Sequence, residues 1–91
     1  MKIGIVGLGL LGGSLAKAYK KNSDHVILGY DKAPSVVEFA RIYGAVDSAM
    51  DKNNIGECEA LLIAVNPKDT VEFLNEHASL ISPKTLVIDC C

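Results

Sequence analysis

Apolar residues fall into four short runs along the chain, and each run has the length of a single strand. The runs cover residues 3–6, 25–30, 60–65 and 85–89. They show little alternation between apolar and polar positions, which is typical of strands buried on both faces of a parallel sheet. Residues 45–50 are more weakly apolar and predict a minor edge strand.

Three stretches between these strands carry apolar residues every three or four positions, which predicts amphipathic helices with one buried face. The third helix is expected over residues 69–80, and the polar residues 51–59 predict a surface loop or an irregular helical turn. The side chains expected to face inward are Leu11, Leu15, Ala16 and Ala18 in the first helix, Val36, Val37, Phe39, Ala40 and Tyr43 in the second, and Val71, Phe73, Leu74 and Ala78 in the third.

The predicted helices also carry end signals. Lys20 and Lys21 close the first helix, where basic residues complement the helix dipole. In the second helix, Ser35 and Glu38 have the spacing of a capping box, and Gly44 fits the position just past the C-terminus.

This alternation of strands and helices predicts an α/β fold with a Rossmann-type, doubly wound parallel sheet in three αβα layers. We expect the strand order 3-2-1-4-5, with the first and fourth strands flanking the switch point. A cleft would then lie above residues 7–12 and 65–67. Residues 1–91 are expected to form one domain, truncated where a complete dinucleotide fold would continue to a sixth strand.

Three glycines follow the first strand at the spacing GxGxxG, and a predicted helix begins directly after them. Gly7 would allow the tight turn, Gly9 would let the backbone approach a pyrophosphate, and Gly12 would let the helix pack closely on the sheet. The first helical turn would direct N–H groups and the positive end of the helix dipole toward the phosphates. Because glycines also gather in ordinary turns, the motif needs a second feature to support it.

That second feature is Asp31, which ends the second strand 19 positions after Gly12. A carboxylate there can accept both ribose hydroxyls of the adenosine half of NAD, and it would repel the 2′-phosphate of NADP. At 4 Å each such repulsion costs about 1 to 4 kcal/mol. Two alternatives stay open: Asp31 could only form a turn or a cap, and Lys32 could attract a phosphate or be solvated.

Charge and composition argue against two classes of partner, nucleic acids and membranes. The net charge is −2 and no basic run exceeds two residues, so nothing indicates a nucleic-acid partner. No apolar stretch approaches the roughly 20 residues that span a bilayer, and no signal-peptide pattern opens the chain. We therefore expect no membrane partner and a cytoplasmic location.

The residues that most often carry chemistry are sparse. Cys58, Cys90 and Cys91 are an odd number without framework spacing, which fits a reducing compartment, although the adjacent pair leaves a redox role open. No His/Cys grouping predicts a metal site. We expect His25 to be half-exposed at a strand start and His77 to be solvated, so no catalytic residue is predicted.

The segments GIVGLGLLGGSLAKAYKK, GYD at residues 29–31 and LLIAVNPKDTVEFL resemble prephenate dehydrogenases, the NAD-dependent enzymes of tyrosine biosynthesis. Gly12, Gly13 and Ser14 are the most distinctive feature, and the closing LVIDCC resembles part of the family's TDVGSVK segment. The resemblance covers all 91 residues but only the N-terminal part of the family's chain. It implies that the C-terminal helical domain for substrate binding and dimerisation is absent, together with a catalytic histidine and a substrate-binding arginine.

The resemblance also implies which residues contact NAD. Asn66 and the Cys90–Cys91 pair depart from the family's pattern, so the contacts to the nicotinamide stay open, with Asp89 and Cys90 expected near it. The expected contacts are Gly7, Leu8, Gly9, Leu10, Leu11 and Gly12 at the pyrophosphate, Tyr30, Asp31 and Lys32 at the ribose, Val65, Asn66 and Pro67 after the fourth strand, and Thr70 at the adenine.

The function implied is the NAD-binding part of a homodimeric prephenate dehydrogenase, which oxidatively decarboxylates prephenate to 4-hydroxyphenylpyruvate. This part is expected to bind NAD without turning prephenate over. Arogenate is an alternative substrate, and a dehydrogenase of the 3-hydroxyacid type or a pyrroline-5-carboxylate reductase is an alternative enzyme. A regulatory nucleotide-sensing domain is the alternative from another class. A histidine in an HPMAG-like segment beyond Cys91 would favour the dehydrogenase.

Overall fold

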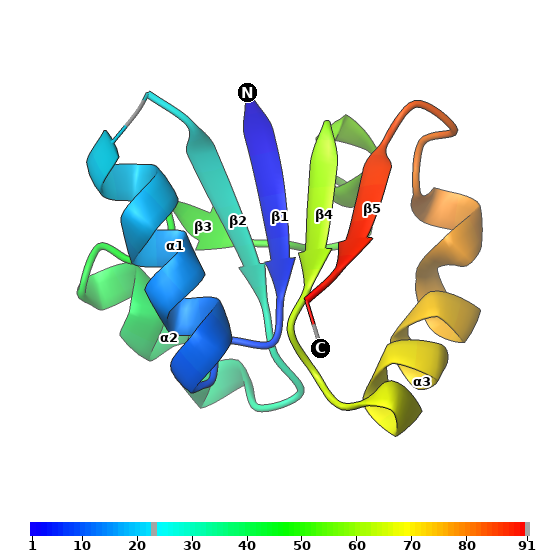
Figure 1. Ribbon diagram of the computed structural model, residues 1–91, viewed down its shortest axis with the longest axis horizontal. Coiled ribbons are helices and arrows are strands. Elements are labelled where there is room, and N and C mark those ends of the chain that lie inside the picture. Colours follow the sequence, from blue (N-terminus) through cyan, green and yellow to red (C-terminus); the bar gives the residue numbers. More distant parts are fainter. Residues whose placement is uncertain (23, 91) are drawn as a thin grey trace.

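The computed structural model describes residues 1–22 and 24–90, with the backbone alone for residues 10, 11 and 22. Its strands form one parallel sheet in the order β3-β2-β1-β4-β5, as predicted (Figure 1). Because all four neighbouring pairs are parallel, the carboxyl ends of the strands meet at one edge of the sheet. The strands are β1 (Lys2–Val6), β2 (Val26–Tyr30), β3 (Ser48–Ala49), β4 (Ala60–Ile63) and β5 (Leu86–Asp89).

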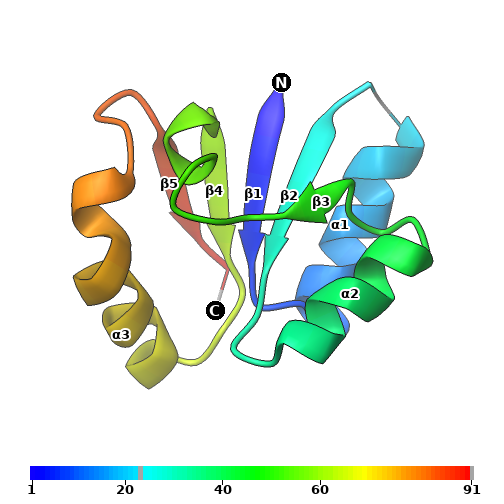
Figure 2. The same ribbon diagram turned by 180° about the vertical axis from the view of Figure 1, so that it is seen from behind.

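Helices flank the sheet and complete the predicted α/β architecture. The helices α1 (Leu10–Asn22) and α2 (Pro34–Ile42) lie beside the half that contains β2 and β3, and α3 (Pro67–His77) lies beside the half that contains β5 (Figures 1 and 2). Two 3₁₀ helices, η1 (Ile55–Glu57) and η2 (Ala78–Leu80), lie before β4 and β5. Among the residues described, no helix is long and apolar enough to cross a membrane.

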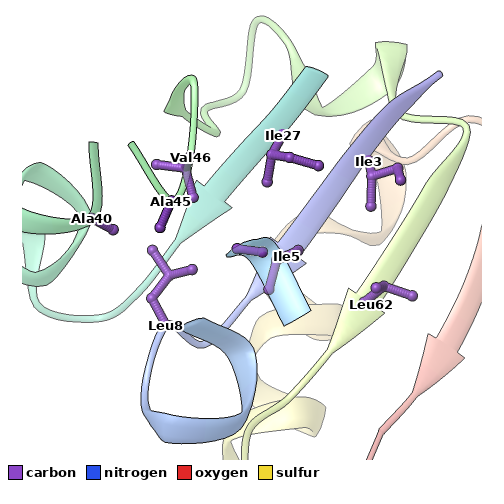
Figure 3. Packing of buried hydrophobic residues seen from close by; sticks show 9 residues of the cluster. Ile3, Ile5, Leu8, Ile27, Ala40, Ala45, Val46 and Leu62 are labelled. Carbon is purple, nitrogen blue, oxygen red and sulfur yellow. The ribbon is translucent and has the colours of Figure 1, made fainter. Parts of the chain in front are cut away.

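The three central strands are buried on both faces, as their apolar runs predicted. Successive side chains of a strand point to opposite faces. On β1, Ile3 and Ile5 therefore join the core cluster packed against α1 and α2, whereas Val6 joins the cluster packed against α3. Figure 3 shows the first cluster from close by, with Leu62 of β4 on the same face as the two isoleucines.

The last strand, β5, is not buried, contrary to the prediction. Leu86, Val87 and Ile88 are 61%, 43% and 41% exposed. In the described sheet β5 pairs with β4 alone, so its side chains are packed from one flank. An apolar run thus predicted the strand correctly but not its surroundings.

The structure also tests the predictions for residues 45–50 and 51–59. The minor edge strand is present but contains only the two residues of β3, which pair with β2. Residues 51–59 form the irregular helical turn, with η1 at its centre. Most of this segment is exposed, as a surface segment should be, but its side chains Ile55 and Cys58 are buried in the cluster around α3.

The predicted capping box of α2 is wrong. The helix begins at Pro34, with Ala33 as its N-cap, and the Glu38 side chain is ion-paired on the helix surface instead. Proline favours the first helical position because its fixed φ already suits a helix, so the helix begins before Ser35 could cap it. Gly44 does occupy the predicted C-terminal position, with a φ of +77°.

The buried faces of the helices are narrower than predicted. Ala16, Ala40 and Phe73 are the buried residues of α1, α2 and α3 among those expected to face inward. Phe39 and Tyr43 contact each other on the surface, with ring centroids 4.4 Å apart. The predicted inward residues that are in fact exposed are Ala18, Phe39, Tyr43, Val71 and Ala78.

Asp47 joins α1 to the sheet and is expected to stabilise the domain. Its Oδ2 atom accepts a hydrogen bond from the Ile27 N–H at 2.7 Å, and its other oxygen pairs with Lys20. Partial burial opposes ionisation, but these two donors prevail and hold the pKa of the Asp47 carboxyl below its ordinary value. We expect Asp47→Ala to lower the free energy of unfolding by about 1 kcal/mol at neutral pH, since the carboxylate is partly solvated.

Because the pKa of Asp47 is lowered by folding, its contribution is present above the pKa of the unfolded state and is lost as the pH falls through the folded-state pKa. Urea unfolding of the wild type and Asp47→Ala between neutral and strongly acidic pH tests this. The two proteins should converge once the pH lies below the lowered pKa of the folded state. Asp24→Ala, which changes an exposed aspartate, is the control. A constant difference at all pH values would contradict the role of the carboxylate.

Candidate functional site

A cleft of about 300 Å³ opens at the carboxyl end of the sheet, between the segments that follow β1, β2 and β4. From β1 the chain leaves toward α1 and from β4 toward α3, so this is the switch point of the doubly wound sheet (Figure 1). The predicted position of the cleft is therefore confirmed. The residues lining it are Val6, Gly7, Gly9, Tyr30, Asp31, Lys32, Ala64, Val65, Asn66, Asp69, Glu72, Phe73 and Glu76.

Gly7 makes the turn from β1 into this cleft. Its φ is +91°, which L side chains rarely adopt, and its N–H donates to the Tyr30 carbonyl at 2.7 Å. A Cβ at this position would lie 2.4 Å from Val65 Cγ1 and 2.7 Å from the Ala64 carbonyl oxygen. Both its backbone conformation and its surroundings therefore require glycine.

The other two glycines of the motif have separate roles. A Cβ at Gly12 would lie 1.7 Å from the Gly7 carbonyl oxygen, so Gly12 lets α1 approach the turn. A Cβ at Gly9 would have no heavy atom of the described residues within 4 Å, apart from its chain neighbours. Gly9 lines the cleft, so the open space beside it is the space in which a pyrophosphate could approach the backbone.

The same turn leads into α1, whose first backbone N–H groups are hydrogen-bond donors at this site. The first hydrogen bond of the helix runs from the Gly13 N–H to the Gly9 carbonyl at 2.8 Å. The N–H groups of residues 10–12 precede it, as at any helix N-terminus, and they add the positive end of the helix dipole. This arrangement suits an anion such as a diphosphate.

Asp31 follows β2 and faces the glycine turn. Its Oδ2 atom accepts the Leu8 N–H at 2.9 Å, and its Oδ1 atom accepts the Ala33 N–H at 3.0 Å. The turn-forming alternative is therefore correct, but it does not use up the carboxylate, because each oxygen has a second lone pair. Asp31 lines the cleft, so both oxygens remain able to accept ribose hydroxyls.

Lys32 is ion-paired rather than freely solvated. Its Nζ atom donates to Asp69 Oδ1 at 2.6 Å and lies 3.6 Å from Glu72 Oε2. The hydrogen bond to Asp69 raises the pKa of the Lys32 ammonium and lowers the pKa of the Asp69 carboxyl. The ion pair joins the segment after β2 to α3 across the cleft.

Asn66 sets the start of α3, two residues before the predicted position. Its Oδ1 atom accepts the Asp69 N–H at 2.9 Å, and Pro67 takes the first helical position. The Thr70 hydroxyl donates to the Asn66 carbonyl at 3.0 Å, inside the helix. Asn66 thus lines the cleft, whereas Pro67 and Thr70 adjoin it without lining it.

An aromatic cluster forms one wall beside the cleft, and it corrects the prediction for His77. The rings of Phe73 and His77 stack with centroids 4.3 Å apart, and Tyr30 meets them at 5.0 and 5.5 Å. His77 is half-buried, and its Nδ1–H donates to the Phe73 carbonyl at 2.9 Å. Burial raises the pKa of the Tyr30 hydroxyl. His25, by contrast, is half-exposed just before β2, as predicted.

Leu8 contributes its backbone and not its side chain. The side chain is 8% exposed and points toward Ala45 and Val46 in the core (Figure 3). Gly29 of β2 leaves the space for it, since a Cβ there would lie 2.9 Å from Leu8 Cδ1. The predicted contacts of the Leu10 and Leu11 side chains lie outside the described residues.

Six lining residues were not predicted, namely the apolar Val6, Ala64 and Phe73 and three carboxylates. Asp69, Glu72 and Glu76 line the cleft from α3, around the buried ring of Phe73. A signal for them was present, because spacings of three and four place these carboxylates on one side of a helix.

A family model for NADP oxidoreductases, coenzyme F420-dependent, matches residues 2–91. The chain belongs to this family. Its place among the family's Rossmann domains agrees with the glycine turn, the switch-point cleft and the strand order described above. A comparison with curated protein sequences finds no significant match.

Solved structures give a finer comparison. The whole chain superimposes on arogenate dehydrogenase from Synechocystis with a TM-score of 0.90 and 29% identity, covering 33% of that chain. Prephenate dehydrogenase from Aquifex aeolicus, in complex with hydroxyphenyl propionate and NAD⁺, gives 0.86 and 22% over 98% of this chain and 32% of that one.

A 3-hydroxyisobutyrate dehydrogenase from Mycobacterium tuberculosis gives a TM-score of 0.79 and 23% identity, over 97% of this chain and 30% of that one. The chain thus spans about a third of the length of these structures. The resemblance to prephenate dehydrogenases noted in the sequence is confirmed as a similarity of this domain.

Proposed function

We propose that this chain is the NAD-binding part of a prephenate dehydrogenase, residues 1–91 forming the N-terminal domain of a longer, homodimeric and cytoplasmic enzyme. The observation that carries the cofactor assignment is Asp31, held beside the open space at Gly9 within one cleft. The resemblance of the Gly12–Gly13–Ser14 segment and the similarity to prephenate and arogenate dehydrogenases support the enzyme assignment.

The residues present fit a dinucleotide. Gly9 leaves room for the pyrophosphate, the first turn of α1 supplies donors, and Asp31 can accept the adenosine ribose. Bound NAD would supply the hydride acceptor for oxidative decarboxylation of prephenate to 4-hydroxyphenylpyruvate. The chain's own part is to bind and orient the cofactor. We therefore expect NAD binding by this chain without turnover of prephenate.

A second candidate is arogenate dehydrogenase. The sequence identity favours it, because this chain is 29% identical to the arogenate dehydrogenase from Synechocystis and 22% identical to the prephenate dehydrogenase from Aquifex aeolicus. The two substrates differ in an amino or keto group that the cofactor domain does not contact. Turnover of prephenate and of arogenate by the longer parent enzyme separates these candidates.

The cofactor assignment is tested by Asp31→Ala. The wild type is expected to bind NADH more tightly than NADPH, because the carboxylate accepts ribose hydroxyls and repels a 2′-phosphate. In Asp31→Ala the affinity for NADH should fall about tenfold or more, equivalent to about 1.4 kcal/mol, and the preference should disappear. Fluorescence titration with both reduced cofactors measures the two affinities.

Asp51→Ala is the matched control, because Asp51 also accepts two backbone N–H groups, from Asn53 and Asn54, but lies outside the cleft. This variant should keep the wild-type affinities for both cofactors. Equal affinities for NADH and NADPH in the wild type and in Asp31→Ala would remove the ribose assignment. The family's name includes NADP, and tighter binding of NADPH than of NADH by the wild type would agree with that name rather than with the ribose assignment.

A further inference from the structure

The charges around the cleft are unevenly distributed. Among the described lining residues there are four carboxylates, Asp31, Asp69, Glu72 and Glu76, and one ammonium, Lys32, which gives a formal charge of −3. Lys32 adjoins Asp31 in the sequence, at the end of the cleft where the ribose of the adenosine half is assigned. It is the one lining cation in the described part of the chain with which a 2′-phosphate could pair.

The structure shows where this cation is held. Lys32 donates to Asp69 at 2.6 Å and lies 3.6 Å from Glu72, and these partners are 37 and 40 positions away in the sequence. Asp69 is the less exposed partner, at 25% for its side chain, and α3 fixes its position because its N–H is bonded to the Asn66 side chain. The ammonium is therefore directed at α3.

We propose that Asp69 and Glu72 determine cofactor specificity by holding Lys32 in an ion pair across the cleft. Because Lys32 is engaged in this ion pair, it does not pair with the 2′-phosphate of NADP. This inference rests on the proposed NAD-binding function. Lysine binds phosphate as a point charge, so a released Lys32 could pair with a 2′-phosphate that Asp31 alone would repel. The Lys32 ammonium is protonated at neutral pH, as any exposed lysine is, and the hydrogen bond to Asp69 raises its pKa further.

Two explanations make different predictions for the neighbouring carboxylate. If the carboxylates of α3 act only through their summed charge, removing Glu76 should help NADPH as much as removing Asp69. If they act by holding Lys32, Glu76 should matter less, because Lys32 pairs with Asp69 and Glu72 among the described residues. Glu76→Gln is therefore the matched control, since it removes one charge from the same helix and the same cleft.

The experiment titrates NADH and NADPH, by cofactor fluorescence, into the wild type, Asp69→Asn, Glu76→Gln and the double variant Asp69→Asn/Glu72→Gln, each with and without Lys32→Met. We expect the double variant to bind NADPH about tenfold more tightly, with a much smaller change for NADH. Glu76→Gln should change the NADPH affinity less than Asp69→Asn, which also removes one charge. Adding Lys32→Met to the double variant should abolish the gain.

Three outcomes would overturn the inference. A gain in NADPH affinity as large in Glu76→Gln as in Asp69→Asn would show that summed charge is sufficient, and a gain that persists with Lys32→Met would show that Lys32 is not its source. NADH binding with no selective gain in the double variant would refute the inference and leave the proposed function standing. No binding of either cofactor by any folded variant, checked by circular dichroism, would refute both.

Discussion

Gly12→Ala is expected to unfold the domain or to lower its free energy of unfolding by more than about 3 kcal/mol. The added methyl group would lie 1.7 Å from the Gly7 carbonyl oxygen and 2.8 Å from its carbonyl carbon, and a backbone group cannot rotate away as a side chain can. To accept the methyl group, α1 would have to move off the sheet. Thermal and urea unfolding followed by circular dichroism measure the loss.

Gly13→Ala is the matched control for this prediction. It adds the same methyl group to the next residue of the same helix, where the nearest atom is the Leu8 carbonyl oxygen at an ordinary contact distance of 3.7 Å. Alanine is favoured over glycine inside a helix by about 0.5 to 1 kcal/mol, so this variant should be as stable as the wild type or more stable. Similar losses of stability in both variants would contradict the assigned role of Gly12.

Gly9→Val is expected to abolish binding of NADH and NADPH while leaving the fold intact. The side chain would enter the open space beside Gly9, where its Cβ has no described heavy atom within 4 Å apart from its chain neighbours, and would occupy the place assigned to the pyrophosphate. The expected loss is at least about 100-fold in affinity, equivalent to about 2.7 kcal/mol. Fluorescence titration measures it, and the melting temperature should be unchanged without cofactor.

A graded series sharpens this test. Gly9→Ala places one methyl group in the same space and should weaken binding less than Gly9→Val. NADH should raise the melting temperature of the wild type, because a ligand that binds only the folded state stabilises it, but should not raise that of Gly9→Val. Undiminished binding by a folded Gly9→Val protein would show that the glycine turn does not hold the cofactor.

The pattern of apolar residues predicted the fold well because a parallel sheet buried on both faces has a simple sequence signature. The residues Ile3, Ile5 and Val6 already required helices on two faces, and the crossover rule then fixed the strand order. The same pattern could not predict the exposure of Val87 on β5, because burial depends on what packs against a strand and not on the strand itself.

The candidate site was predictable where its parts belong to one short segment of the sequence. The glycine spacing and Asp31 have requirements that local sequence expresses directly, so the turn and the carboxylate were found at their residue numbers. The contributions of α3 were not found, because Asp69 and Glu72 meet Lys32 only when β2 and β4 bring their carboxyl ends to the same edge of the sheet. His77 was misplaced for the same reason, since its ring partner Tyr30 is distant in the sequence.

The carboxylate of Asp31 serves two structures at once, since it joins the Leu8 N–H of the glycine loop to the Ala33 N–H ahead of α2. Replacing this carboxylate by a residue that tolerates a phosphate also leaves the Leu8 and Ala33 N–H groups without their present acceptor. A lineage that switched between the two cofactors would therefore pass through a weakened intermediate, unless a compensating change came first. In this domain, the residue assigned to set the cofactor preference is also a residue that holds the glycine loop in place.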